Sequence, residues 1–138
     1  FTGIRISYMG SENDYEILEE IGKGTYGKVY RAARKDGQIF AIKIIDLDQD
    51  DDMDDVMQEI STLQACKCPK LTKYYGSFMN GSSLWVVMEL LEGGSLQDLM
   101  HLTNSTFNEN TIAWIMKEML IGLNYLHTER KIHRDIKA

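Results

Sequence analysis

The glycines at positions 22, 24 and 27 have the spacing of a loop that binds phosphate. Without side chains, backbone N–H groups can approach phosphate oxygens that a Cβ would hold away. Dinucleotide-binding folds use similar spacing with an acidic residue about 20 residues later, a role open to Asp46 or Asp48. That fold needs a helix directly after the glycines, whereas here a strand-like run at 28–33 leads to an Asp36-Gly37 hairpin signal of type I′. We therefore predict that the glycines join two antiparallel strands.

Two charged residues lie within or beside apolar segments. Lys43 interrupts the otherwise apolar run at 39–45, and a lysine in such a strand is costly to bury unless an anion pairs with it. Glu59 falls beside the apolar stripe of the helix predicted next. Taken alone, Lys43 could face water from an edge strand and Glu59 could be a solvated flank residue. Together they suggest an ion pair that directs the lysine toward a phosphate.

A third polar group, His133 to Lys137, follows the last predicted helix. Asp135 could accept a proton from a hydroxyl while Lys137 offsets the charge of a phosphate. A short polar cluster after a helix is usually only a loop. The catalytic interpretation of this cluster therefore depends on the other two groups.

The elements that must position these groups are five strands and three helices. Strands are predicted at 15–21, 28–33, 39–45, 71–78 and 84–90, and Asn80-Gly81 supplies the hairpin signal between the last two. Apolar residues at 53, 56, 57, 60 and 63 share one face of the helix that carries Glu59. Ser95 is expected to cap a short helix that ends near position 101. Asn108 is expected to cap a long helix whose apolar stripe continues to Leu126.

The chain has 138 residues and a formal net charge of −6, and this acidity comes from seven aspartates between Asp46 and Asp55. A calcium loop of the EF-hand type would need a central Gly and a closing Glu, which the run lacks, so a solvated loop or helix entrance is favoured. Aspartates also suit the positive N-terminal end of the helix that follows. An acidic chain is not expected to be a general nucleic-acid binder.

The remaining composition points to a reducing compartment. Cys66 and Cys68 are too close together for a good disulfide and lack the partners of a zinc site. We expect two reduced thiols and a cytoplasmic location. No apolar run reaches the roughly 18 residues of a membrane span.

Taken in chain order, these motifs resemble the signature set of the eukaryotic protein kinases. The set is Gly22-x-Gly24-x-x-Gly27-x-Val29, then Phe40-Ala41-Ile42-Lys43, then Glu59, then His133-Arg134-Asp135. The resemblance runs from about position 14 to position 138. The segments at 42–46, 72–78, 84–90 and 132–138 are similar to the germinal-centre and sterile-twenty-like group. Lys137, two residues after Asp135, fits the serine/threonine kinases.

The resemblance implies an α+β kinase fold, with a five-stranded antiparallel N-lobe sheet, one helix, and the first helices of a helical C-lobe. It implies binding of ATP, with Mg²⁺ in the complete kinase, and transfer of the γ-phosphate to Ser or Thr hydroxyls of protein substrates. Lys43, oriented by Glu59, would hold the α- and β-phosphates, Asp135 would be the catalytic base, and Lys137 would steady the phosphoryl group. Met88 would be the gatekeeper, and the backbones of Glu89 and Leu91 would bond the adenine edge. The other residues expected around ATP are Ile21, Gly22, Gly24, Gly27, Val29 and Ala41.

The expected organisation is a flexible leader at 1–13, a kinase N-lobe at 14–91, a hinge at 92–94 and the start of a C-lobe at 95–138. In the family, a magnesium-binding Asn follows the catalytic Asp by five residues and an Asp-Phe-Gly motif comes later. Neither falls within these residues, so no metal ligand is assigned. We expect an incomplete catalytic domain, inactive alone, with an apolar patch exposed on its long helix. The alternative is a short non-catalytic module that binds nucleotide or another kinase. Regulatory or scaffold proteins are expected as partners.

Overall fold

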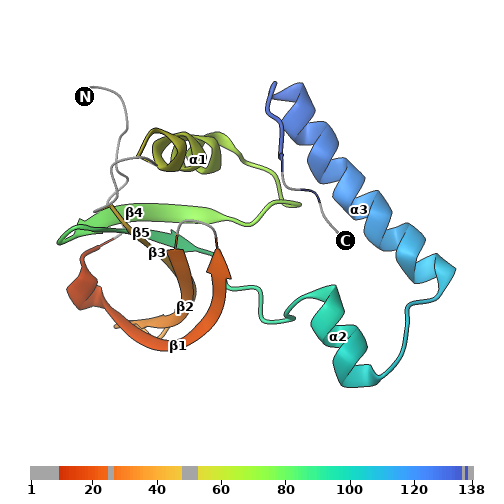
Figure 1. Ribbon diagram of the computed structural model, residues 1–138, viewed down its shortest axis with the longest axis horizontal. Helices are drawn as coiled ribbons and strands as arrows, with labels where there is room; N and C mark the ends of the chain where they lie inside the picture. The colour runs from red at the N-terminus through yellow and green to blue at the C-terminus, as the bar shows by residue number, and fades with distance from the viewer. Residues whose placement is uncertain (1–9, 25–26, 48–52, 135, 137–138) are drawn as a thin grey trace. The chain divides into compact units, whose positions relative to one another are not determined.

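The computed structural model describes residues 10–24, 27–47, 53–134 and 136, with the side chains of 53–55 excepted. A short 3₁₀ helix at Glu12–Asp14 precedes the first strand. The strands and helices that follow are β1 (Tyr15–Gly24), β2 (Gly27–Arg34), β3 (Ile39–Asp46), α1 (Met53–Ala65), β4 (Tyr74–Asn80), β5 (Ser83–Met88), α2 (Leu96–Thr103) and α3 (Glu109–Thr128). Figure 1 shows them along the chain.

The five strands form one antiparallel sheet, as predicted, and the structure gives their order as β1-β2-β3-β5-β4. Figure 1 shows β1, β2 and β3 curling strongly, with α1 lying over the sheet beside β4. β1 does not end at Gly22 but continues to Gly24, which pairs with Gly27 at the start of β2. The element after the glycines is therefore a strand, and the dinucleotide-binding interpretation is excluded because it needs a helix there.

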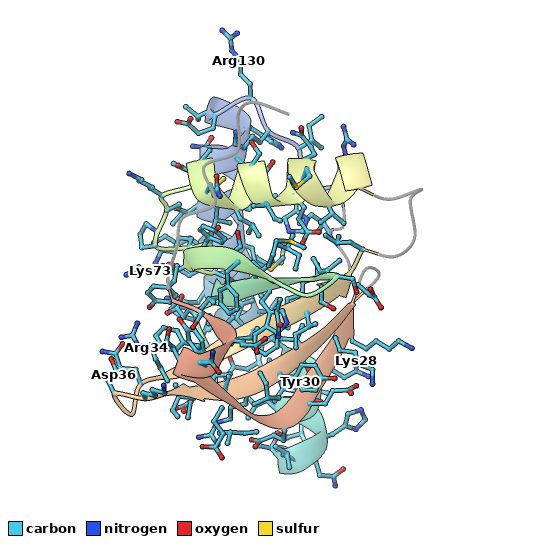
Figure 2. The ribbon with its side chains drawn as sticks, turned by 90° about the vertical axis from the view of Figure 1, so that its left-hand side faces the viewer. Lys28, Tyr30, Arg34, Asp36, Lys73 and Arg130 are labelled. Carbon is cyan, nitrogen blue, oxygen red and sulfur yellow. The ribbon has the colours of Figure 1, made fainter. Side chains whose placement is uncertain are left out.

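The turn between β2 and β3 differs from the predicted type I′ turn. The N–H of Gly37 donates to the carbonyl of Arg34 at 2.8 Å, and Gly37 has φ +85° while Asp36 is not in the left-handed region. This is the three-residue hairpin loop in which a single glycine follows a regular turn, whereas type I′ requires positive φ at both central residues. Arg34 holds the tip through an ion pair with Asp36, and its guanidinium lowers the pKa of the Asp36 carboxyl. Both lie at one end of the hairpin in Figure 2.

The sheet packs a different apolar cluster on each face. One face gathers aromatic and aliphatic side chains from all five strands; its buried members are Tyr15, Ala32, Phe40, Ile42, Phe78 and Val87. The other face packs against α1, whose buried residues Val56 and Ile60 meet Ile45, Leu84 and Val86. Figure 2 shows side chains filling the layer between α1 and the sheet. The predicted stripe of α1 is therefore the surface that docks it.

The chain forms two compact units, the first within residues 1–65 and 72–90 and the second within 66–71 and 91–138. In the second unit the loop at 66–71 lies against α3. The N–H of Lys67 donates to Tyr125 Oη at 2.8 Å, Lys70 pairs with Glu118, and Gly122 leaves room for the Lys70 backbone. Three successive turns of α3 thus hold this loop.

Both helices of the second unit begin at the predicted caps. Ser95 accepts from the N–H of Asp98 at 3.0 Å, and Asp98 bonds back to the Ser95 backbone, which is a complete capping box. Asn108 accepts from the N–H of Thr111 at 2.9 Å. The apolar stripe of α3 is largely exposed: among its described residues only Gly122 and Leu126 are buried. Among the described residues, no helix is both long and apolar enough to cross a membrane.

Candidate active site

Lys43 lies at the centre of a lateral row of residues that crosses all five strands. Across β1, β2, β3, β5 and β4 in turn, the paired residues are Gly22, Val29, Lys43, Val86 and Ser77. Laterally paired residues project from the same face of a sheet. This is the face covered by α1, because Val86 belongs to the cluster that packs on α1. The Lys43 side chain therefore leaves the sheet toward α1.

Lys43 and Glu59 form the predicted ion pair. Lys43 Nζ lies 2.8 Å from Glu59 Oε1, and the side chains are 13% and 39% exposed. The next residue, Ile60, is buried against the sheet, and this turns the side of α1 that carries Glu59 toward β3. An ammonium this deeply buried needs an anionic partner, and a charge-assisted hydrogen bond is stronger than a neutral one. The pair therefore fixes the direction of the Lys43 ammonium.

The three glycines differ in what surrounds them. A Cβ on Gly22 would meet only Val29, at 4.0 Å, and one on Gly24 would lie 3.7 Å from Lys43 Cε. At these two positions the missing side chain leaves the backbone open on the side of Lys43. A Cβ on Gly27 would overlap the carbonyl oxygen of Ile44 and lie 3.0 Å from its carbon. Gly27 is thus required by the close approach of β2 and β3, whatever the ligand.

Two of the residues expected around an adenine ring, Ala41 and Met88, occupy the neighbouring row on the same face. Ala41 pairs with Met88 across β3 and β5, two residues along from Lys43 and Val86. Ala41 is buried, and Met88 packs against the cluster under α1. Ile21, beside Gly22 in β1, is exposed.

Two further predicted residues lie where the first unit ends. The N–H of Glu89 donates to the Lys73 carbonyl at 2.9 Å, so the backbone group that Glu89 can offer an adenine is its carbonyl. Leu91 is exposed and begins the second unit, with which it is described.

The predicted catalytic segment is only partly described. His133, Arg134 and Ile136 are exposed, and Arg134 has φ +64°. Asp135 and Lys137 lie outside the described residues, as does most of the aspartate run at 46–55 with its predicted role at the helix entrance. Within the described part of the chain, no group of three or more His, Cys, Asp or Glu side chains could hold a metal ion.

Sequence reasoning missed a polar cluster on the same face of the sheet. Gln64 Nε2 donates to Tyr74 Oη at 3.1 Å, and Tyr74 Oη shares a hydrogen bond of 2.9 Å with Ser77 Oγ. Tyr74 and Ser77 are three apart in a strand, a spacing that normally points to opposite faces. The lone Gly76 inside this strand is a signal for a β-bulge, but it does not show that the bulge brings Tyr74 and Ser77 together.

The two cysteines have free thiols and are half-buried. Burial raises the pKa of the Cys66 thiol. Because the thiolate is the reactive form, this disfavours reaction at Cys66. The predicted reduced state agrees with this environment.

A five-stranded antiparallel sheet, one helix on its face joined to it by a lysine–glutamate pair, and further helices after the last strand define a protein of the α+β, protein-kinase-like class. Residues 15–138 match the family model described as the protein kinase domain. The chain belongs to the protein kinase family. It is thus a kinase by family, and its family uses ATP and Mg²⁺.

The residues of the first unit fit the phosphates of ATP. The backbone at Gly22 and Gly24 is left open by the missing side chains and lies on the face of the sheet from which the Lys43 ammonium projects. A Cβ at Gly24 would project beside that ammonium. Backbone N–H groups and a lysine are the donors that nucleotide phosphates require. Lys43, Gly22 and Gly24 would hold the phosphates, with Val29, Ala41 and Met88 providing the apolar surface for adenine.

Proposed function

We propose that this chain is catalytic-domain sequence of a serine/threonine protein kinase of the germinal-centre and sterile-twenty-like group. The reaction is transfer of the γ-phosphate of ATP to Ser or Thr hydroxyls of proteins. The observation that carries the proposal is the Lys43–Glu59 ion pair at 2.8 Å, on the face of the sheet that also bears Gly22, Val29 and Met88. In protein kinases a lysine–glutamate pair of this kind must be in place for catalysis.

Each residue has a distinct part in the proposed reaction. ATP supplies the phosphoryl group. Lys43 neutralises charge on the α- and β-phosphates and is held in place by Glu59. Asp135 accepts the proton of the substrate hydroxyl, and Lys137 offsets charge on the phosphoryl group as it moves. The position of Lys137, two residues after Asp135, supports Ser and Thr as acceptors.

We further propose that these 138 residues bind ATP loosely and do not turn over by themselves. They contain no Asp-Phe-Gly motif, and phosphoryl transfer by kinases depends on Mg²⁺ held by the Asp of that motif. Sustained phosphorylation of a generic substrate by the isolated residues would overturn this part of the proposal.

The full-length protein is the material for the main test. It is incubated with Mg-ATP and mixed Ser, Thr and Tyr peptides, and the phosphorylated residue types are identified. Lys43→Met should abolish phosphorylation and weaken ATP binding, measured by isothermal titration. The matched control is Lys28→Met, because Lys28 also forms a 2.8 Å ion pair, with Glu20, but is 51% exposed. Phosphotyrosine alone would refute the Ser/Thr assignment, and equal effects of the two substitutions would refute the site.

A further inference from the structure

A β-bulge in β4 places two polar side chains on the face of the sheet that carries Lys43. Tyr74 pairs with Met88, and Gly76 pairs with Val87, so Tyr75 is an extra residue in β4. After the bulge, Ser77 pairs with Val86. Tyr74 and Ser77 therefore lie in the two adjacent lateral rows that contain Ala41 and Lys43. A bulge of this kind re-aims a side chain that regular pairing would send to the other face.

The hydroxyl of Tyr74 connects this face of the sheet to α1. It accepts from Gln64 Nε2 at 3.1 Å and shares a 2.9 Å hydrogen bond with Ser77 Oγ. Ser77 is 1% exposed and is the one buried polar residue among those the structure describes. A buried hydroxyl needs a hydrogen-bond partner, and Tyr74 is the partner observed here. The tyrosine ring itself packs against the cluster under α1.

α1 thus makes polar contacts with the sheet at two different turns, with apolar packing between them. Glu59 bonds to Lys43, and Gln64, five residues later, bonds to Tyr74. Between these contacts Ile60 is buried and Leu63 is half-buried. Apolar packing is non-directional and tolerates small shifts of a helix, whereas hydrogen bonds are directional. Two such bonds at different turns of one helix restrict both its translation and its rotation.

We propose that Tyr74 is a positioning residue for the phosphate-binding lysine. Its hydroxyl holds the C-terminal end of α1, and this sets the place of Glu59 and so the direction of the Lys43 ammonium. The inference rests on the proposed function, because it gives the Lys43–Glu59 pair a role in binding ATP. Without the hydroxyl, α1 keeps its apolar packing but loses a directional bond between its C-terminal end and the sheet.

The test compares Tyr74→Phe with Tyr75→Phe in the full-length protein. The two changes remove the same atom from adjacent residues, but Tyr75 packs on the opposite face of the sheet, edge-to-face against Phe40 at 5.2 Å. Isothermal titration measures the affinity for ATP, and hydrogen exchange measures the protection of α1 amides. Tyr74→Phe should weaken ATP binding about 3- to 10-fold, which is the change in affinity that corresponds to the free energy of one neutral hydrogen bond. It should also reduce the protection of the α1 amides from hydrogen exchange. Tyr75→Phe should change neither by more than about 2-fold.

A double-mutant cycle separates positioning from a general loss of stability. In a Glu59→Gln background, Tyr74→Phe should weaken ATP binding less than about 2-fold, since the charge that it positions is already absent. Equal effects of Tyr74→Phe in both backgrounds, or no effect in either, would overturn the proposal. If Tyr74→Phe fails to fold, Gln64→Met removes the same bond from the helix side and should show the same coupling.

The Lys43→Met variant separates the function proposed for the site from the role proposed for Tyr74. If Lys43→Met leaves ATP affinity unchanged, the proposed function of the site fails. If Lys43→Met weakens binding while Tyr74→Phe behaves as Tyr75→Phe does, only the role of Tyr74 fails.

Discussion

Replacing Gly27 with alanine separates the structural glycine of the loop from those that leave room for phosphate. The new Cβ would overlap the carbonyl oxygen of Ile44 and lie 3.2 Å from the Cα of Ile45. Both atoms belong to the backbone of β3, which is paired on one side with β2 and on the other with β5. The strand cannot move away without disturbing both ladders.

The magnitude follows from two opposing effects. Overpacking of a tight site costs about 1–3 kcal/mol and occasionally more, and a clash with paired backbone belongs at the upper end. Removing a glycine lowers the entropy of the unfolded chain, which returns about 0.4–1 kcal/mol. We expect Gly27→Ala to lower the free energy of unfolding by about 2 kcal/mol. For a chain of this size that corresponds to a melting temperature lower by roughly 8 °C.

The matched control is Gly24→Ala. A Cβ there lies at ordinary contact distances, 3.6 Å from the Gly27 carbonyl oxygen and 3.7 Å from Lys43 Cε. Its free energy of unfolding should change by less than about 0.5 kcal/mol, while its affinity for ATP falls because the methyl group projects beside the Lys43 ammonium. Circular dichroism melts and isothermal titration measure the two quantities. Melting of Gly27→Ala within 2 °C of the parent protein, on the order of measurement error, would refute the reasoning.

Three further predictions concern the second unit. Hydrogen bonds from Ser95 lower the pKa of Asp98 below its ordinary value of 3.8. The contribution of the ionised carboxyl to the stability of α2 is therefore present above pH 3.8 and is lost as the pH falls through the folded pKa. Ser95→Ala should raise the titration midpoint of the Asp98 carboxyl measured by NMR, and an unchanged midpoint would contradict this. Asn108→Ala should cost about 1 kcal/mol and speed exchange of the first amides of α3, whereas Asn110→Ala, inside the same turn, should not. Gly122→Leu should displace the loop at 66–71, whose Lys70 backbone lies 3.4 Å from the position of a Cβ; unchanged amide exchange at Lys67 would exclude this.

The elements set by local patterns could be predicted from the sequence. Alternation and turn residues located all five strands within a few residues, and Ser95 and Asn108 cap the helices that were expected of them. The Lys43–Glu59 pair could be predicted because a lysine inside an apolar strand needs an anion and the next helix offers a single carboxylate beside its apolar stripe. Each of these features depends on the free energy of a residue within its own strand or helix, which the neighbouring sequence determines.

Features that depend on how strands meet could not be predicted. Gly76, the residue after Tyr75, permits a bulge in β4, but a glycine does not determine which residue is extra or which side chains then meet, so the contact between Tyr74 and Gln64 could not be predicted. The different roles of Gly24 and Gly27 depend on the distance between β2 and β3, which spacing along the chain does not contain. The predicted type I′ turn at Gly37 is wrong because Asp-Gly permits both geometries, and the pairing of Arg34 with Gln38 decides between them.

The alternation of β3 has a consequence for folding fidelity. Ile42 and Ile44 project into the aromatic side of the sheet, and Lys43 between them projects toward α1. If β3 paired with its neighbours one residue out of register, the Lys43 ammonium would enter the aromatic cluster and an isoleucine would lie opposite Glu59. Both changes raise the free energy of the misregistered form. The energy that selects the register of the third strand therefore also places the lysine on the face of the sheet that α1 covers.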